Sequence, residues 1–345
     1  MTDNSQPAGR RQFLKNSMAV VGGTVAIGQA NPSSSRAASP ASQGRLPREV
    51  WIGTLSIEGM RGRDAADMTQ QVLEVMRQMA PHRPDVICLP ETFLGGVSNS
   101  EPLQPATGEI GEVLKPLADF AQEHHCHVVC PVHTRDGKRT YNSAVFIDRQ
   151  GKLTGSYHKI HTTTGEMGDG ILPGPTDVPV FDTDIGKLGA QICFDIEWSD
   201  GWQRLAEKQA EIVFWPSAFG GGAMVNSKAW QHQYCVVSST HKGASKICDV
   251  SGEELAATSR WNRWVCAAVN LEKAFLHTWP YVQRFDEIHA KYGRDVRIRN
   301  FADEEWSILE SRSPDIKIAD VLKEFELKTM REHLAIADEQ QRQLR

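Results

Sequence analysis

The stretch "KLGAQICFDIEW", residues 187–198, decides what kind of fold this chain adopts. Its first eight residues are largely apolar and small, which predicts a buried strand over 187–194. One thiol, that of Cys193, stands at the end of this strand and precedes a Phe-Asp pair. A cysteine at such a place can be a small buried hydrophobic residue, half of a disulfide, a metal ligand or a nucleophile. The rest of the sequence is needed to choose among these four.

Segments with strand and helix character alternate on both sides of this stretch. Residues 64–80 have helical spacing, with Met68, Val72, Val75 and Met79 on one side. The other helical segments are 110–125, with Pro116 as an irregularity, 200–210 and 318–345, and 229–240 runs from helix into strand. The other expected strands are 50–57, 85–91, 126–134, a hairpin of 141–148 and 153–160, 211–219 and 264–273. This alternation predicts a mixed α/β layered domain, for which residues 48–275 suffice.

The first residues of the chain have the features of an export signal. An arginine pair, Arg10 and Arg11, precedes a short apolar run with small residues after it. The pair with its neighbours resembles a twin-arginine signal, which would be cut after Ala30 or Ala37. We therefore expect a signal peptide over 1–37, a linker over 38–48, passage through the twin-arginine export machinery, and a periplasmic or secreted protein.

Composition excludes several other classes of protein. Hydrophobic residues make up 40% of the 345 residues and charged residues 23%, which is ordinary for a soluble domain. The net charge is −5 without a dense basic run, so we expect no nucleic-acid partner. The apolar run near the N-terminus is too short for a membrane span, so none is expected in the mature protein. Seven cysteines, an odd number without regular spacing, argue against a disulfide framework.

Three polar residues, Glu91, Lys159 and Cys193, end or follow expected strands, where sites in α/β folds are commonly built. A thiol needs a base or a nearby positive charge, a carboxylate can take its proton, and an ammonium can stabilise an oxyanion. Together they suit acyl transfer from an amide or nitrile carbon. The residues alone leave the alternatives open, namely a buried structural cysteine, a turn glutamate and an exposed lysine.

Three segments around these residues resemble the signature segments of the nitrilase superfamily, the carbon–nitrogen hydrolases. They are "VICLPETF" (86–93), "YNSAVFIDRQGKLTGSYHKIH" (141–161) and "KLGAQICFDIEW", and they occur in the family's order. The resemblance implies a four-layer αββα sandwich that associates into αββα-αββα dimers. It also implies a carbon–nitrogen hydrolase domain over 49–278.

The resemblance further implies roles for individual residues. Glu91 would be the general base, Lys159 the oxyanion stabiliser and Cys193 the nucleophile, with no metal ion and no organic cofactor. A second glutamate often follows the lysine in this family, and Glu166 is the candidate. The residues implied for the oxyanion and substrate pocket are Phe194, whose backbone N–H would be a second donor, Trp215 and Ser217.

Substrate class is the least defined part of the resemblance. Members that act on nitriles typically carry Trp-Glu after the cysteine, whereas this chain has Phe194 and Asp195, as the amidase and carbamoylase branches do. Residues 196–200 depart from the pattern of those branches. We expect a small-molecule amide or N-carbamoyl substrate. Nitrile hydrolysis and a non-catalytic binding or assembly protein on the same fold are the alternatives.

Two further segments need an interpretation. His124, His125, Cys126, His127 and Cys130 crowd seven residues, but a helix end running into a strand would not direct them to one metal ion. The large apolar side chains of residues 279–345 need a surface to cover, either this domain or another subunit. The resemblance suggests a neighbouring subunit, so we expect a C-terminal extension that forms a homo-oligomer, with packing on the chain's own domain as the alternative. Those side chains are Trp279, Tyr281, Phe285, Phe301, Trp306, Leu309, Phe325 and Leu327.

Overall fold

A computed structural model describes residues 46, 48–96, 111 and 113–345. The predicted signal peptide, 1–37, and most of the linker, 38–48, lie outside the described residues. The twin-arginine export signal therefore stays a prediction from sequence.

The first of two six-stranded sheets runs in the order β12-β1-β2-β3-β4-β5. Its central strands β1, β2 and β3 are parallel, while β4, β5 and β12 join through antiparallel pairs. The strand bounds are β1 Glu49–Leu55, β2 Val86–Cys88, β3 His127–Asp136, β4 Arg139–Ile147, β5 Leu153–His158 and β12 Trp264–Asn270.

The second sheet repeats this plan in the order β11-β10-β9-β8-β7-β6. Strands β7, β8 and β9 are parallel, and the strands outside them pair antiparallel. The bounds are β6 Phe181–Thr183, β7 Gly186–Ala190, β8 Ile212–Ser217, β9 Cys235–Thr240, β10 Lys246–Cys248 and β11 Glu254–Ala257.

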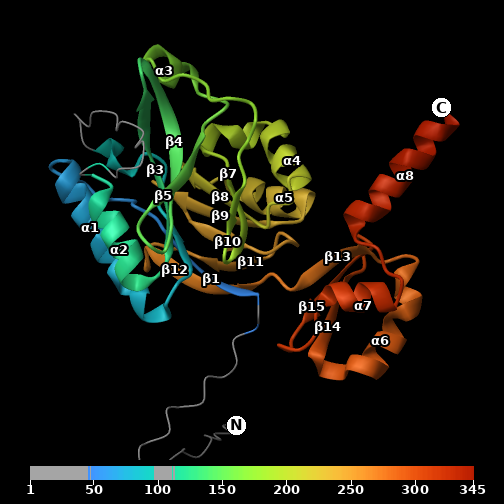
Figure 1. Ribbon diagram of the computed structural model, residues 1–345. Coiled ribbons are helices and arrows are strands. Elements are labelled where there is room, and N and C mark those ends of the chain that lie inside the picture. Colours follow the sequence, from blue (N-terminus) through green and yellow to red (C-terminus); the bar gives the residue numbers. More distant parts are fainter. Residues whose placement is uncertain (1–45, 47, 97–110, 112) are drawn as a thin grey trace, which may run out of the picture. The chain divides into compact units, whose positions relative to one another are not determined.

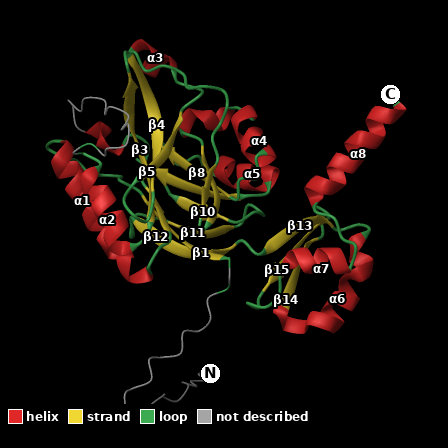
Figure 2. Cartoon of the chain, viewed as in Figure 1, coloured by secondary structure: helices red, strands yellow, loops and turns green. Residues whose placement is uncertain are grey.

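Helices cover the outer face of each sheet (Figures 1 and 2). One hydrophobic cluster joins α1 and α2 to the first sheet, and another fills the space between the sheets and reaches α4 and α5. The helix bounds are α1 Ala65–Met79, α2 Lys115–His124, α4 Asp200–Glu207 and α5 Ala223–His232. The predicted mixed α/β fold with an αββα layering is confirmed.

The two sheets run in the same direction where they meet. The hydroxyl of Thr54 donates to the carbonyl of Ser238 at 2.6 Å, and Ser56 and Thr240 form a parallel bridge. Because β1 is parallel to β2 and β9 is parallel to β7, the carboxyl ends of β2 and β7 emerge at the same end of the sandwich. Strand β5, two antiparallel steps from β3, ends there too.

Local sequence explains where the first two helices begin. The side chain of Asp64 caps α1 by accepting from the backbone N–H of Asp67. Residues 110–125 were predicted to be one helix with Pro116 as an irregularity, but α2 begins at Lys115. Pro116 then lies in the first turn, where its missing N–H costs no helical hydrogen bond.

The C-terminal part of the chain contains a third sheet, of order β13-β15-β14, that the sequence did not predict. Its elements are β13 Lys273–His277, α6 Phe285–Tyr292, β14 Val296–Phe301, β15 Trp306–Ser311, α7 Ile318–Glu324 and α8 Met330–Leu344. The prediction of one helical segment from Ile318 to the C-terminus was wrong in detail. Glu326 has φ 54°, and the Thr329–Glu332 capping box begins a new helix.

Most of the large apolar side chains of the C-terminal part are covered by this chain itself. Phe285, Leu309, Phe325 and Leu327 belong to the cluster formed by the third sheet and its helices. The ring of Trp306 packs against that of Trp230 in α5, with 4.2 Å between the ring centroids. Burial within the chain therefore accounts for these residues without a partner. The exposed apolar residues that remain are Trp279, Val282, Leu334, Ile336 and Leu344.

The structure also bears on membrane insertion and on the state of the cysteines. In the part of the chain that the structure describes, no helix is both long and apolar enough to cross a bilayer. All seven cysteines lie among the described residues, and each is a free thiol. Cys193 is therefore not half of a disulfide.

Candidate active site

Lys159 follows β5 directly, and its ammonium lies between the two predicted glutamates. Its Nζ is 2.9 Å from Oε1 of Glu91 and 2.8 Å from Oε2 of Glu166. Glu91 follows β2 in a turn, and Glu166 lies in α3, Thr164–Gly168, where it completes a capping box with Thr163. Lys159 is 1% exposed and Glu91 4% exposed, so this pairing of charges is shielded from water.

Opposite charge overcomes burial at Lys159 and at Glu166. Burial disfavours the charged form of Lys159, but the carboxylates of Glu91 and Glu166 outweigh it and raise the pKa of the ammonium. Burial likewise opposes ionisation of Glu166, yet hydrogen bonds from Asn142 and Lys159 lower the pKa of that carboxyl. At neutral pH the lysine is therefore a cation and Glu166 an anion.

Asn142, in β4, is a residue of this cluster that the sequence reasoning missed. Its Nδ2 donates to Oε1 of Glu91 and to Oε1 of Glu166, both at 2.8 Å. Its backbone carbonyl also accepts from the backbone N–H of Lys159 at 2.8 Å. The segment "YNSA" (141–144) contains this asparagine, but nothing in the local sequence pattern marks its side chain as part of a site.

Cys193 lies beside this cluster in a turn rather than at the end of a strand. The strand predicted over 187–194 ends at Ala190, and Cys193 begins the 3-10 helix η3, Cys193–Glu197. Its φ is 44°, in the left-handed region that costs free energy for a residue with a Cβ. The turn lifts the thiol out of the sheet at the end where Glu91 and Lys159 emerge.

The thiol of Cys193 is protonated at neutral pH. Its side chain is 7% exposed. Burial raises its pKa to about 12, and the negative charge of Glu91 acts in the same direction. The charge of Lys159, the backbone N–H of Ala218 and the hydroxyl of Ser217 oppose this shift without cancelling it. A nucleophile in this environment needs a base at the moment of attack.

Asp195 fixes the cysteine turn against the lysine segment, which the sequence did not predict. Its Oδ2 accepts from the hydroxyl of Tyr157 at 2.7 Å and from the backbone N–H of Ile192 at 2.8 Å. Its Oδ1 accepts from the backbone N–H of His161 at 2.8 Å. One buried carboxylate thus ties together the two segments on either side of the thiol and the ammonium.

The three predicted pocket residues all lie next to Cys193. The indole N–H of Trp215 donates to the carbonyl oxygen of Cys193 at 3.0 Å, and Ser217 faces the thiol. Phe194 follows the cysteine in η3, and its ring makes a T-shaped contact with that of Trp198, with 4.9 Å between ring centroids. Trp198 in turn stacks on His161 with 4.3 Å between ring centroids, so three aromatic rings form a cluster next to the cysteine turn.

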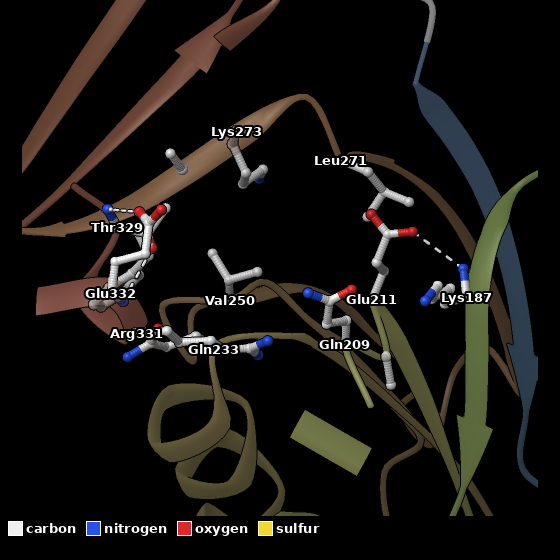
Figure 3. Close-up of a pocket in the computed structure, with 13 residues that line it drawn as sticks. Lys187, Gln209, Glu211, Gln233, Val250, Leu271, Lys273, Thr329, Arg331 and Glu332 are labelled. Carbon is white, nitrogen blue, oxygen red and sulfur yellow. Dashed lines mark hydrogen bonds between the residues drawn. The ribbon is translucent and has the colours of Figure 1, made fainter. Parts of the chain in front are cut away.

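Two other places in the molecule could be mistaken for functional sites. A cavity of about 570 Å³ lies beside the C-terminal part and is lined by Lys187, Glu211, Lys273 and Arg331, with none of the predicted site residues (Figure 3). In the crowded His and Cys segment, His127 bonds to Asp184 at 2.7 Å. Among the described residues, no three His, Cys, Asp or Glu side chains are grouped to hold a metal ion.

Comparison with known proteins identifies the family. The family model described as carbon-nitrogen hydrolase matches residues 24–274, well over half of the chain. The chain belongs to the carbon-nitrogen hydrolase family. The family is described as one of carbon-nitrogen hydrolases.

Individual relatives are distant. The chain is 26% identical over 182 residues to the nitrilase and fragile histidine triad fusion protein NitFhit of Drosophila melanogaster, covering 50% of this chain and 40% of that protein. It is 29% identical over 161 residues to the deaminated glutathione amidase of Synechocystis sp. (strain PCC 6803 / GT-S), covering 43% and 58%. The chain thus spans about half the length of these curated relatives.

A solved structure supports the fold. Nit3 of Saccharomyces cerevisiae, a member of branch 10 of the nitrilase superfamily, superposes with a TM-score of 0.58 at 20% identity. The superposition covers 65% of this chain and 91% of that chain. At this identity the likeness concerns the fold alone.

Proposed function

We propose that this protein is a hydrolase that cleaves an amide or N-carbamoyl bond through a thioester on Cys193. The observation that carries the proposal is a protonated, buried thiol beside a carboxylate that is held by a buried lysine. The similarity to a deaminated glutathione amidase supports an amide-type bond.

In the first half of the reaction, Sγ of Cys193 attacks the carbonyl carbon while Glu91 takes the thiol proton. The carbonyl oxygen becomes an oxyanion, which the ammonium of Lys159 and the backbone N–H of Phe194 stabilise. The carbon–nitrogen bond then breaks. The leaving nitrogen takes the proton from Glu91 and departs as ammonia or amine, leaving an acyl thioester.

In the second half, Glu91 takes a proton from water, and the resulting hydroxide attacks the thioester carbon. The carbon–sulfur bond breaks, the acid is released, and the sulfur regains its proton from Glu91. Glu166 remains an anion throughout and keeps Lys159 charged and in place. These steps need no electron transfer and no co-reactant besides water.

The test is a substrate panel. Propionamide, N-carbamoylglycine and propionitrile are incubated with the protein, and released ammonia is measured. We expect ammonia from the amide or the carbamoyl compound and none from a Cys193→Ala variant. Activity confined to the nitrile would overturn the assignment of substrate class, and undiminished activity of Cys193→Ala would overturn the mechanism.

We also propose that the protein is exported and forms a homo-oligomer. The arginine pair and the apolar run that follows it support export through the twin-arginine machinery. The exposed side chains of Leu334, Ile336 and Leu344 on α8 support association of at least two copies. Replacing Arg10 and Arg11 with Lys is expected to keep the protein in the cytoplasm. Equal fractionation of both forms would overturn the proposal of export.

A further inference from the structure

Four groups in the site form a closed ring of polar contacts. Lys159 Nζ and Asn142 Nδ2 each contact Oε1 of Glu91 and Oε1 of Glu166, over distances of 2.8 to 3.0 Å. Donors and carboxylates therefore alternate around the ring. When both glutamates are ionised, the ring carries two negative charges and only one positive charge, that of Lys159. The neutral amide of Asn142 is the second donor to the two carboxylates.

The orientation of the Asn142 amide follows from this ring. If the amide were turned over, its oxygen would face two carboxylate oxygens, which accept hydrogen bonds and donate none when ionised. With Nδ2 facing them, both of its hydrogens are used. Oδ1 of Asn142 is then buried without a hydrogen-bond partner among the described residues. The unpartnered buried oxygen costs free energy, which the two hydrogen bonds from Nδ2 to the carboxylates offset.

The ring treats the two oxygens of Glu91 differently. Oε1 accepts from both Asn142 and Lys159. Among residues 48–96 and 113–345, no side chain or backbone group forms a hydrogen bond with Oε2. A carboxylate oxygen that already accepts two hydrogen bonds is a poorer proton acceptor than its unengaged neighbour.

We propose that Asn142 is a positioning residue that anchors Oε1 of Glu91 against Lys159 and Glu166, so that Oε2 takes the proton of Cys193. The proposal rests on the proposed function of Glu91 and Cys193. It assigns Asn142 no contact with the substrate. Its effect is to fix the orientation of the Glu91 carboxylate while another carboxylate lies within reach of the same two donors.

The charged and titratable groups that face Glu91 come from several elements. They are Lys159 after β5, Glu166 in α3, Cys193 in η3, His133 in β3, and His241, whose ring nitrogen contacts the carbonyl oxygen of Glu91. Near neutral pH the first two keep their charges, because the pKa of Lys159 is raised and that of Glu166 is lowered. Asn142 donates one hydrogen bond to Glu91 and one to Glu166, so its removal takes away a neutral donor that holds Oε1 of Glu91 in place.

The experiment measures alkylation of Cys193 by iodoacetamide as a function of pH, followed by peptide mapping. This readout reports removal of the thiol proton and needs no substrate. In Asn142→Ala we expect alkylation at pH 7 to fall roughly 10- to 100-fold, because Glu91 loses a hydrogen bond that positions it. In the isosteric Asn142→Asp variant the loss at pH 8 should be larger. It should lessen as the pH falls, because the introduced carboxyl group regains one donor when it is protonated.

The matched control is Asn270→Ala. Asn270, at the end of β12, is also a buried asparagine that donates to a carboxylate, Oε1 of Glu310, at 3.1 Å. Its loss should lower stability and leave the alkylation profile of Cys193 unchanged. A wild-type pH profile in both Asn142 variants would overturn the proposal, even if the wild-type protein hydrolyses the substrate panel. A wild-type protein without any hydrolysis would instead refute the proposed function.

Discussion

The indole nitrogen of Trp215 donates a 3.0 Å hydrogen bond to the carbonyl oxygen of Cys193, so the end of β8 holds the backbone of the cysteine turn. Trp215 is fully buried, and Cys193 has a positive φ. Because Cys193 is backbone-strained and Trp215 lies in a rigid strand, this hydrogen bond fixes the direction of the thiol as well as the backbone of the turn. The geometry of the nucleophile therefore depends on a hydrogen bond to its backbone, made by a residue from another strand.

Trp215→Phe is expected to lower kcat roughly 10- to 100-fold, because a small displacement of a reacting atom is costly. The variant should also lose about 1–3 kcal/mol of stability, since a buried carbonyl loses its donor. Rates and urea unfolding measure the two effects. Trp264→Phe is the control, because the indole of Trp264 donates to Gln78 at an exposed site. An unchanged kcat for Trp215→Phe would show that the bond does not position the thiol.

Alkylation of Cys193 should depend on Glu91 and not on a low pKa. Burial raises the pKa of the Cys266 thiol to about 12, the same range as that of Cys193, but among the described residues no carboxylate contributes to the shift at Cys266. We expect brief iodoacetamide treatment at pH 7 to label Cys193 before Cys266, and Glu91→Gln to abolish that preference. Faster labelling of Cys266 in the native protein would contradict a base at Cys193.

The pH–rate profile should lack the rise that a free thiol gives. An ordinary cysteine ionises near pH ~8.5, whereas the pKa of Cys193 is raised to about 12, so its thiol stays protonated between about pH 7 and 9.5. The pKa of Lys159 is raised as well, so the cation persists over the same range. We expect kcat/KM to be flat there. An increase with an apparent pKa near that of an ordinary cysteine would mean that a preformed thiolate is the reactive species.

The layered fold followed from the sequence because its pattern is local. Short apolar segments alternate with amphipathic helices from 50 to 270, and the expected strands and helices recur in the structure with shifted ends. The third sheet escaped prediction since β14 and β15 are half polar and read as irregular, charged sequence. Helices α7 and α8 were predicted as one helical segment because no glycine or proline separates them. The break is made by the capping box at Thr329, which the sequence pattern did not reveal.

The site was predictable only in part. Glu91, Lys159 and Cys193 could be singled out because each follows an apolar strand and bears reactive chemistry. Asn142 and Asp195 could not, since their importance comes from hydrogen bonds to residues distant in the sequence, such as that from Tyr157 to Asp195 across 38 positions. The left-handed turn at Cys193 was also missed, because the apolar run continues past the end of β7.

Association should depend on the outer part of α8. A cut before Phe285 would remove the buried cluster of the third sheet, so it would test folding rather than association. A chain ending at His333 keeps the contacts of Arg331 with the carbonyls of Ala206 and His232 and removes the exposed apolar residues of α8 named above. We expect the full chain to sediment as at least a dimer at micromolar concentration and the shortened chain to dissociate. A monomeric full-length protein would refute association.

The central claim is that Cys193 carries the acyl group during turnover. The most direct measurement quenches the protein in acid during steady-state hydrolysis of propionamide or N-carbamoylglycine and maps its peptides by mass spectrometry. The account predicts a mass increase equal to the acyl or carbamoyl group on the peptide that contains Cys193, and neither adduct nor turnover in Cys193→Ala. Turnover that persists in Cys193→Ala, or an adduct on another residue, would contradict it.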